Sequence, residues 1–399
     1  MFNPLVSDLV KGLSPSATFA MAQKSLELRE KGIDVVNLSV GEPDFNTPNS
    51  IKAVATQAVQ DNFSKYSPVS GYGSLKKAIC GKLFRENGLR YTPSEIVVSN
   101  GAKQSIFNAI QVLVNPGDEV IIPAPYWVSY PQMVKLVGGA PVFIDTSMET
   151  NFKISSVQLE KAITEKTRVL ILCSPCNPTG AVYSFKDLED IASVILKHDN
   201  LLVISDEIYE HINYVGRHYS IAGLDGMKER TILINGVSKA YAMTGYRIGF
   251  MAGPQWVADA CSLVQGQTTS GPCSVSQKAA EEAWTGEQDC VEMMRTAFEK
   301  RRDLIVSLIR EVPGLEVNKP EGAFYLFPNC SSYFGKHYGG QTIKSSTDLA
   351  IFLLEVGHVA TVAGDAFGAP EYIRLSYATS EENIKEGVER IMKALELIV

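Results

Sequence analysis

Short apolar runs alternate with amphipathic stretches through the middle of the chain. Runs rich in Val, Ile and Leu occur at residues 95–99, 118–123, 141–145, 168–173, 201–205 and 230–235. Stretches with helical periodicity follow the first four runs, at residues 101–114, 128–137, 155–163 and 186–198. Strands that alternate with helices predict βα units, and strands without polar positions predict a mostly parallel sheet with helices on both faces. The pattern therefore predicts an α/β fold, whose ligands bind at the carboxyl ends of the strands.

The pattern changes after Pro254. Helical periodicity is found at residues 256–267, 276–284 and 288–311, shorter strands are expected at 315–319, 322–327 and 372–378, and helices are expected at 348–355 and 381–397. These elements predict a second, smaller α+β domain, since a chain of 399 residues usually forms more than one domain. The predicted division is an N-terminal segment that packs with the small domain, a large domain and a small domain, at residues 1–45, 46–290 and 291–399.

Composition excludes several classes of function. The formal net charge is −7, which argues against nucleic acid or an anionic membrane as a main partner. No signal peptide and no apolar run of membrane-spanning length is expected, so the sequence favours a cytoplasmic protein. The seven cysteines and five histidines lack disulfide-framework or metal-binding spacing. Cys173 and Cys176 form a C-x-x-C pair, which we interpret as structural thiols because no second pair accompanies it.

Polar and aromatic residues gather where the predicted strands end. Gly101 and Ala102 lie between a strand and a helix, where free N–H groups suit a phosphate, although an ordinary βα turn has the same pattern. Trp127 either stacks on a planar ligand or packs in the core. Asn177 either offers its amide to a ligand or belongs to a plain Pro/Gly turn. Asp206 ends an apolar strand, where a carboxylate is costly unless donors or a cation meet it, or it caps the next helix.

The segment "GVSKAYAMTGYRIGF", residues 236–250, adds two cations at the end of another strand. Taken alone, Lys239 is most simply a loop lysine facing solvent, but a desolvated lysine has a lowered pKa and becomes a usable nucleophile or base. With Asp206, Ser238 and Arg247, it would hold a planar, phosphorylated cofactor that has a basic ring nitrogen. Pyridoxal phosphate fits, because its chemistry needs a lysine Schiff base and an acidic partner for the ring nitrogen.

Seven motifs, in order along the chain, carry a family resemblance. They are "SVGEPDFNTP", "KYSPVSGYGSLKKAI", "APYWVSYP", "SPCNPTGAVY", "SDEIYEHI", "GVSKAYAMTGYRIGF" and "YIRLSYATS". The chain resembles the class I pyridoxal-phosphate aminotransferases nearly end to end, and most closely the bacterial and plant aspartate aminotransferase branch that includes prephenate aminotransferases. The resemblance implies the fold-type I architecture of pyridoxal-phosphate-dependent transferases and a homodimer with shared sites.

The resemblance also implies a role for each matching residue. Lys239 would form an aldimine with the cofactor and shuttle the substrate's proton, and Asp206 would keep the ring nitrogen protonated. Tyr209 and Asn177 would hydrogen-bond the 3′-oxygen of the ring, and Trp127 would stack on the ring. The groups implied to hold the cofactor's phosphate are Gly101, Ala102, Lys103, Ser238 and Arg247, together with Tyr66 from the neighbouring subunit. The groups implied to hold the substrate are Gly41, Lys103, Trp127, Asn177, Arg374 and Thr18.

The substrate is less firmly indicated than the reaction. Arg374 would clamp the α-carboxylate, unless it merely faces solvent from its strand, and Lys103 would bind the distal carboxylate, unless it is an exposed helix lysine. We expect aspartate and 2-oxoglutarate. Prephenate is the alternative or additional acceptor, since Thr18 in "SPSATF" matches prephenate users, whereas Ser14 replaces the lysine expected there.

Two other functions keep the cofactor but change its use. A lyase or decarboxylase would release ammonia or carbon dioxide without a keto-acid acceptor. A pyridoxal-phosphate sensor module of a gene regulator ranks last, because the chain has no basic helix-turn-helix extension and a net charge of −7.

Overall fold

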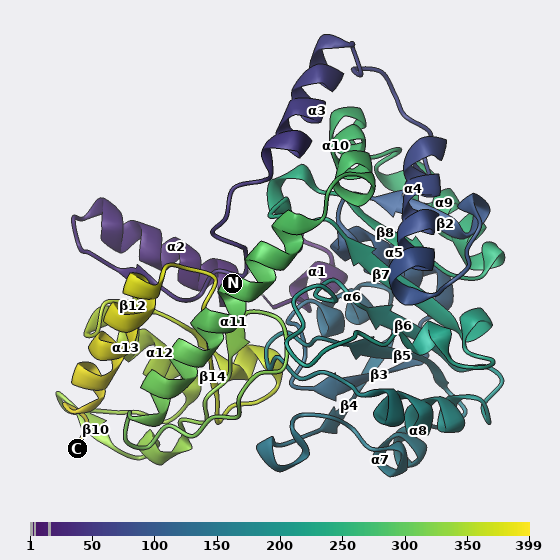
Figure 1. Ribbon diagram of the computed structural model, residues 1–399. Helices are drawn as coiled ribbons and strands as arrows, with labels where there is room; N and C mark the ends of the chain where they lie inside the picture. Colours follow the sequence, from purple (N-terminus) through teal and green to yellow (C-terminus); the bar gives the residue numbers. More distant parts are fainter. Residues whose placement is uncertain (1–2, 4, 15–16) are drawn as a thin grey trace.

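A seven-stranded sheet forms the centre of the larger part of the molecule (Figure 1). The computed structural model describes residues 3, 5–14 and 17–399, without the side chains of residues 17–19 and 22. The strand order is β2-β8-β7-β6-β5-β3-β4, and all neighbours are parallel except β8, which is antiparallel to β2 and β7. The strands are β2 (Ile96–Ser99), β3 (Glu119–Ala124), β4 (Ala140–Asp145), β5 (Thr167–Cys173), β6 (Leu202–Asp206), β7 (Thr231–Gly236) and β8 (Gly249–Ala252).

Helices cover both faces of this sheet. Successive side chains of a strand point to opposite faces, so Ile171 packs with α5, α6 and α9, whereas Leu170 and Leu172 pack with α7 and α8. Near β2 and β8 the second face is covered by α4 and α10. The inner strands are thus buried on both sides, as the sequence predicts, whereas Phe143 of the edge strand β4 is exposed. These helices are α4 (Gly73–Lys82), α5 (Ala102–Leu113), α6 (Tyr130–Leu136), α7 (Ser156–Ala162), α8 (Phe185–Ile195), α9 (Gln255–Thr268) and α10 (Ser274–Thr285).

A second group of elements packs beside the large sheet, seen at the lower left of Figure 1. Its three-stranded antiparallel sheet has the order β13-β14-β9, and β1 pairs in parallel with β12. Phe298 and Ile305 of α11 and Ile391 of α13 share one apolar core with the strands. The strands are β1 (Val36–Asn37), β9 (Tyr325–Leu326), β10 (His337–Tyr338), β11 (Gln341–Thr342), β12 (Val359–Ala360), β13 (Val362–Ala363) and β14 (Ile373–Ser376). The remaining helices are α1 (Asp8–Lys11), α2 (Ala17–Glu30), α3 (Asn49–Gln60), α11 (Asp289–Arg310), α12 (Ser346–Glu355) and α13 (Glu381–Leu395).

One expected strand is wrong, and the strand β8 of the large sheet and the two-residue strands β1, β10, β11, β12 and β13 were not expected. Residues 315–319 form only an isolated bridge, between Glu316 and Asn329, and beyond it the Asn318 side chain donates to the carbonyl of Met148 in the larger part, at 2.8 Å. The short strand β8 was missed because its four residues follow directly on the Lys239–Arg247 segment, without a turn signal of their own.

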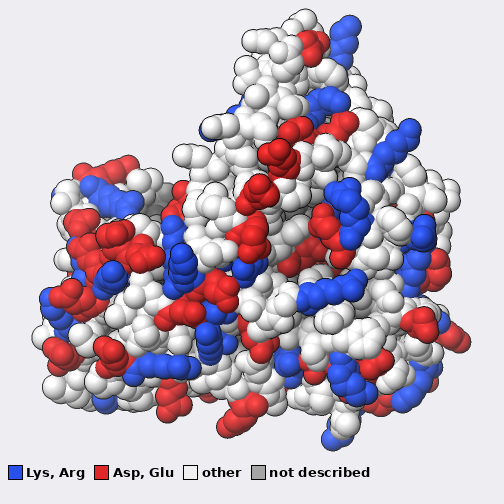
Figure 2. Space-filling view, in the orientation of Figure 1, with Lys and Arg blue, Asp and Glu red and all other residues white. Residues whose placement is uncertain are grey.

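Charged side chains of both signs are interspersed on the face of the molecule shown in Figure 2. In the part of the chain that the structure describes, no helix combines the length and the apolar character that crossing a membrane requires.

Candidate active site

A cavity of about 680 Å³ lies at the carboxyl ends of β5, β6 and β7, where β14 of the smaller part approaches the large sheet. The parallel strands bring their ends to one edge, so residues far apart in the sequence meet there. The predicted site residues that line this cavity are Gly41, Ala102, Lys103, Trp127, Asn177, Asp206, Tyr209, Ser238, Lys239, Arg247 and Arg374.

Lys239 faces this cavity just beyond the end of β7. Its Nζ donates to the carbonyl oxygen of Gly41 at 2.5 Å and lies 5.7 Å from the ring centre of Tyr209. Among the described residues no carboxylate forms an ion pair with it. Burial, which the charge of Glu42 only partly offsets, lowers the pKa of Lys239 to about 8. The amine therefore carries a substantial neutral, nucleophilic fraction near neutral pH.

Asp206 is the last residue of β6 and only 4% exposed. Its carboxylate accepts hydrogen bonds from the Tyr130 hydroxyl at 2.6 Å and from the Ile208 N–H at 3.3 Å. Burial raises its pKa to about 6, although both hydrogen bonds oppose the shift. Within the described part of the chain it has no cationic ion-pair partner. A basic ring nitrogen beside it would supply the missing cation and restore the charged carboxylate.

The first turn of α5 forms a cationic corner of the cavity with Ser238 and Arg247. Gly101 precedes the helix with a φ of 83°, and a Cβ there would lie 2.3 Å from the Arg247 guanidinium, so only glycine fits. The Gly101 N–H donates to the Ser99 carbonyl at 2.7 Å, whereas the N–H groups of Ala102 and Lys103 have no partner among the described residues. Free N–H groups at a helix N-terminus beside an arginine are a binding site for a phosphate.

Arg374 projects into the cavity from β14 and is 2% exposed. Its guanidinium donates to Asn177 Oδ1 at 3.0 Å and to the Ser39 carbonyl at 2.7 Å, and it lies over the Tyr325 ring at 4.5 Å. Its Nε is buried without a partner among the described residues. A buried arginine that lacks a carboxylate partner is suited to a carboxylate that arrives with a ligand.

Two tyrosines and an aromatic plate complete the walls. The hydroxyls of Tyr209 and Tyr325 share a hydrogen bond at 2.7 Å, and burial raises the pKa of Tyr209, which keeps it protonated and able to donate. Trp127 is half-buried, and the ammonium of Lys103 lies 4.9 Å from its ring centre. Burial of this ammonium and the charge of Arg247 lower the pKa of Lys103. The cavity lining thus includes an indole ring with the Lys103 ammonium beside it, in addition to Arg374.

Three predicted site residues are not among those that line the cavity: Tyr66, Thr18 and Gly101, which precedes α5 beside Arg247. Tyr66 is 98% exposed in the single chain, and the side chain of Thr18 lies outside the described residues. Conversely, the sequence reasoning missed the hydrogen bond from Tyr130 to Asp206 and the role of Tyr325 beside Tyr209. The signal for Tyr130 was its place after a strand end in the motif "APYWVSYP"; Tyr325 had no comparable signal.

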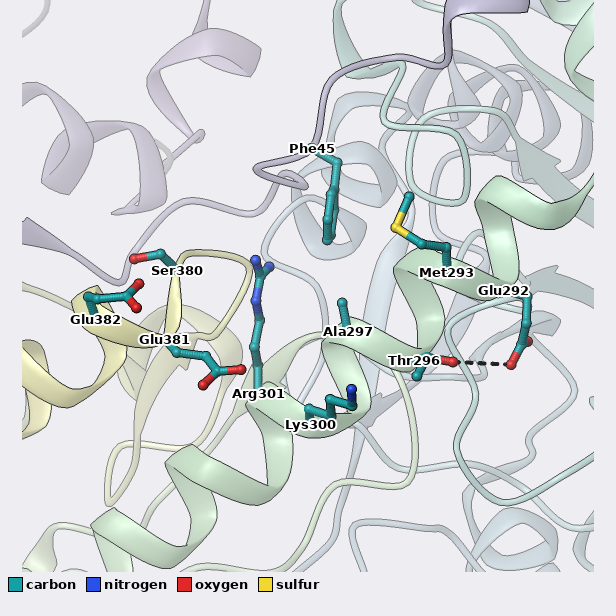
Figure 3. A pocket seen from close by; sticks show the side chains of 10 residues that line it. All are labelled: Phe45, Glu292, Met293, Thr296, Ala297, Lys300, Arg301, Ser380, Glu381 and Glu382. Carbon is teal, nitrogen blue, oxygen red and sulfur yellow. Dashed lines mark hydrogen bonds between the residues drawn. The ribbon is translucent and has the colours of Figure 1, made fainter.

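A second hollow, of about 610 Å³, lies between Phe45, α11 and the start of α13 (Figure 3). Arg301 in its wall is held by Asp44 in a bidentate pair at 2.7 and 3.0 Å. None of the predicted site residues lines it, and its charged side chains are exposed or paired. Hydrogen bonds lower the pKa values of Glu292 and Glu382 in its wall, which keeps both as ordinary charged carboxylates.

Sequence and structure comparisons agree on one family. The family described as "Aminotransferase class I and II" matches residues 33–391. A "Probable aspartate/prephenate aminotransferase" of Rickettsia conorii is 47% identical over 99% of both chains. A "Bifunctional aspartate aminotransferase and glutamate/aspartate-prephenate aminotransferase" of Petunia hybrida is 48% identical over 98% of this chain and 82% of its own. The crystal structure of the aspartate aminotransferase from Rhizobium meliloti superposes with a TM-score of 0.95 at 42% identity over the full length of both chains. The fold, the cavity and these similarities together place this chain in the class I and II aminotransferase family.

Proposed function

We propose that this chain is a pyridoxal-phosphate-dependent aspartate aminotransferase. The observation that carries the proposal is a set of charged groups around one cavity that all lack the partner they need. Lys239 has no carboxylate, Asp206 has no cation, and Arg374 has a buried Nε with no acceptor in the described chain. The missing partners differ: the cofactor would supply the group that binds Lys239 and the ring nitrogen that faces Asp206, and the substrate would supply the carboxylate that Arg374 binds.

The chemistry of the lining residues suits pyridoxal phosphate. Lys239 would hold it through its amine, Asp206 would face its ring nitrogen and Trp127 would cover its ring. The phosphate would lie at the free N–H groups of α5, where the absence of a Cβ on Gly101 leaves room beside Arg247. When bound, this cofactor supplies an electron sink that stabilises negative charge on the substrate's α-carbon.

The chain's own side chains then move and place the reacting groups. Lys239, with its lowered pKa, takes a proton from the α-carbon and returns it, because a base whose pKa lies near the working pH is best suited to both transfers. Arg374 fixes the α-carboxylate with its planar fork and so orients the bond that loses the proton. Tyr209 and Asn177 would donate hydrogen bonds to the 3′-oxygen of the ring, and Asp206 would hold the proton on the ring nitrogen.

Aspartate and 2-oxoglutarate are the proposed substrates, with Lys103 as the partner of the distal carboxylate. Lys103 and Arg374 both line the cavity, and we propose that each meets one carboxylate of a dicarboxylate substrate. Prephenate is the second candidate acceptor, and the printed names of the Rickettsia and Petunia relatives favour it. The threonine implied in prephenate binding, Thr18, is present in the sequence, while Ser14 stands where a lysine was expected.

The test is one half-reaction cycle followed by absorbance. Aspartate should bleach the visible band of the bound cofactor, and after the amino acid is removed 2-oxoglutarate should restore it. Return of the band with prephenate would add that activity. A Lys103→Met variant should raise the KM for aspartate roughly tenfold, the scale of one screened charge pair, and leave a monocarboxylic donor unaffected. Release of ammonia or carbon dioxide without any acceptor would replace the proposal with a lyase or decarboxylase.

We also propose a homodimer in the cytoplasm, divided as predicted at residues 1–45, 46–290 and 291–399. The fully exposed Tyr66 is available to reach the neighbouring subunit's phosphate site, and the seven free cysteines suit a reducing compartment. Sedimentation measures the dimer, and a Tyr66→Phe variant should weaken cofactor binding without changing the sedimentation coefficient.

A further inference from the structure

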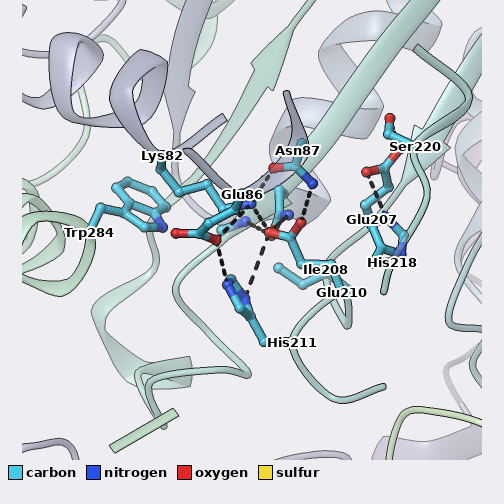
Figure 4. Close-up of polar contacts among 12 residues, drawn as sticks. Lys82, Glu86, Asn87, Glu207, Ile208, Glu210, His211, His218, Ser220 and Trp284 are labelled. Carbon is cyan, nitrogen blue, oxygen red and sulfur yellow. Dashed lines mark hydrogen bonds and ion pairs between the residues drawn. The ribbon is translucent and has the colours of Figure 1, made fainter. Parts of the chain in front are cut away.

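A buried lysine outside the cavity, Lys82, ends α4 and faces the segment that follows β6 (Figure 4). It is 1% exposed. Its ammonium forms an ion pair with Glu210, donates to Asn87 Oδ1 at 2.9 Å and lies 3.5 Å from Glu86 Oε2. Lysine is almost never buried unless it is paired, and these partners satisfy that condition.

Glu210 connects Lys82 to two strand ends that carry site residues. It follows Tyr209 directly, and its Oε1 also accepts a hydrogen bond from Asn235 Nδ2 at 2.7 Å. Asn235 lies near the end of β7, four residues before Lys239, and its Oδ1 accepts from the Gly236 N–H at 2.7 Å. One buried carboxylate therefore ties the segment of Tyr209 to the strand that leads to Lys239.

The segment between Asp206 and Glu210 sends its side chains to two places. Asp206 and Tyr209 line the cavity, whereas Glu207 and Glu210 point into buried polar clusters. Glu207 accepts from Ser205 Oγ at 2.8 Å and pairs with His218 at 2.9 Å. Asp206 and Tyr209 are thus each followed by a carboxylate, Glu207 or Glu210, that is held by hydrogen bonds or ion pairs outside the cavity.

A metal ion is a weaker explanation of this cluster. Glu86, Glu210 and His211 place possible ligand atoms within 4.8 Å of one another. However, the Lys82 ammonium already contacts both carboxylates. Burial opposes the charged form of Glu210, but Lys82 and His211 outweigh it and hold the pKa of Glu210 well below its usual value. The lysine therefore takes the place that a cation would occupy.

We propose that Lys82 is a positioning residue for amino transfer, acting through Glu210 on Tyr209 and on the strand that leads to Lys239. This inference rests on the proposed function, because it concerns the placement of residues around the bound cofactor. Without Lys82, Glu210 would be a buried carboxylate left with the amides of Asn87 and Asn235 and with His211 Nδ1 at 3.7 Å. It would take up a proton or turn towards water, and its hydrogen bond to Asn235 and the placement of Tyr209 would be lost with it.

The test is the pH titration of the visible absorbance of the holoenzyme, which reports the proton on the nitrogen shared by Lys239 and the cofactor. In Lys82→Met, Tyr209 would donate less well to the ring oxygen, which then keeps more negative charge and holds that proton more tightly. The midpoint should therefore rise by about one pH unit, the scale of one hydrogen bond to a charged group. The matched control is Lys393→Met, which removes an exposed lysine from its i,i+4 pair with Glu389 and should not move the midpoint.

A second variant separates positioning from folding. Lys82→Met/Glu210→Leu removes both buried charges, so it should fold better than Lys82→Met while its midpoint stays raised, because Asn235 and Tyr209 remain unanchored. A wild-type midpoint in this double variant, or in a folded Lys82→Met, overturns the inference while the proposed function stands. Absence of the visible band in the wild-type protein supplied with pyridoxal phosphate would overturn both.

Discussion

Lys82 and Lys239 are two enclosed lysines in one molecule with opposite surroundings. The ammonium of Lys82 contacts two carboxylates, those of Glu210 and Glu86, and Lys82 is not among the residues that line the active-site cavity. Lys239 has a backbone carbonyl and aromatic rings for neighbours, faces a cavity, and has its pKa lowered to about 8 by burial. The first lysine is satisfied and inert, and the second is kept reactive.

Two acids of the same segment repeat this contrast. Glu210 is held charged by Lys82, which keeps its pKa below the usual value despite burial. Asp206 has no cation paired with it in the described chain, and burial raises its pKa to about 6. Burial alone therefore does not distinguish a working charge from a structural one. The presence or absence of a partner within the protein does.

The comparison is tested most severely by removing the reactive lysine. Lys239→Met should reduce transamination between aspartate and 2-oxoglutarate by more than about 10⁴-fold, because it removes both the cofactor's attachment and the proton carrier. The melting temperature of the cofactor-free protein should not fall, since the lost amine had no ion pair. Steady-state rates and a thermal scan measure the two effects, and turnover within tenfold of wild type would contradict the assignment.

Removal of the paired lysine, Lys82, should instead lower the stability of the protein. Lys82→Met should lower the free energy of unfolding by about 3–5 kcal/mol, because it leaves Glu210 buried without its cation. Urea unfolding measures the loss. Lys393→Met serves as the exposed control and should change stability by less than about 1 kcal/mol. A loss no larger than that of the control would show that the Lys82 pair is not structural.

Arg374 belongs with Lys239, since it too is a buried cation without a carboxylate. Arg374→Lys should lower kcat/KM for aspartate roughly 100-fold, because a lysine keeps the charge but loses the planar fork. Arg301→Lys is the comparison variant, since Arg301 is already paired with Asp44 outside the cavity, and it should stay near wild type. If Arg374→Lys and Arg301→Lys lowered kcat/KM equally, the contrast between an unpaired arginine in the cavity and a paired arginine outside it would be wrong.

The smallest effect concerns the pH dependence of stability in the cofactor-free protein. The pKa of Lys239 is about 8 when folded and 10.5 as its ordinary value. Between these values the unfolded chain binds more protons, so the free energy of unfolding should rise with pH. The rise is at most about 3 kcal/mol, less where solvent reaches the amine. Urea unfolding at pH 7.5, 9 and 10 should show no such rise in Lys239→Met. An identical rise in the variant would mean that another group causes the pH dependence of stability.

The local pattern of the sequence predicted most of the cavity. Asp206 and Lys239 stand where apolar strands end, and a parallel sheet brings such ends to one edge. The resemblance added Gly41, Lys103, Tyr209 and Arg374, and the strand of Arg374 gives no independent sign of facing a site. The apolar runs of the large sheet were found for the same local reason, whereas the strand expected at residues 315–319 is reduced to a single bridge at Glu316.

The partners that set the chemistry could not be predicted in this way. Tyr130 and Asp206 are 76 residues apart, Tyr209 and Tyr325 are 116 apart, and Lys82 and Glu210 are 128 apart. Nothing in the spacing of Lys82 on its helix distinguishes it from an exposed lysine. Its burial depends on where α4 meets the segment after β6, which only the fold determines.

The central claim is that Lys239, and no other enclosed lysine, carries the cofactor. The most direct measurement is reduction of the pyridoxal-phosphate-loaded protein with borohydride, followed by digestion and mass spectrometry of the labelled peptide. The account predicts that the added mass lies on Lys239, with Lys82 and Lys103 unmodified. A label on Lys82, on Lys103 or on no single lysine would contradict it.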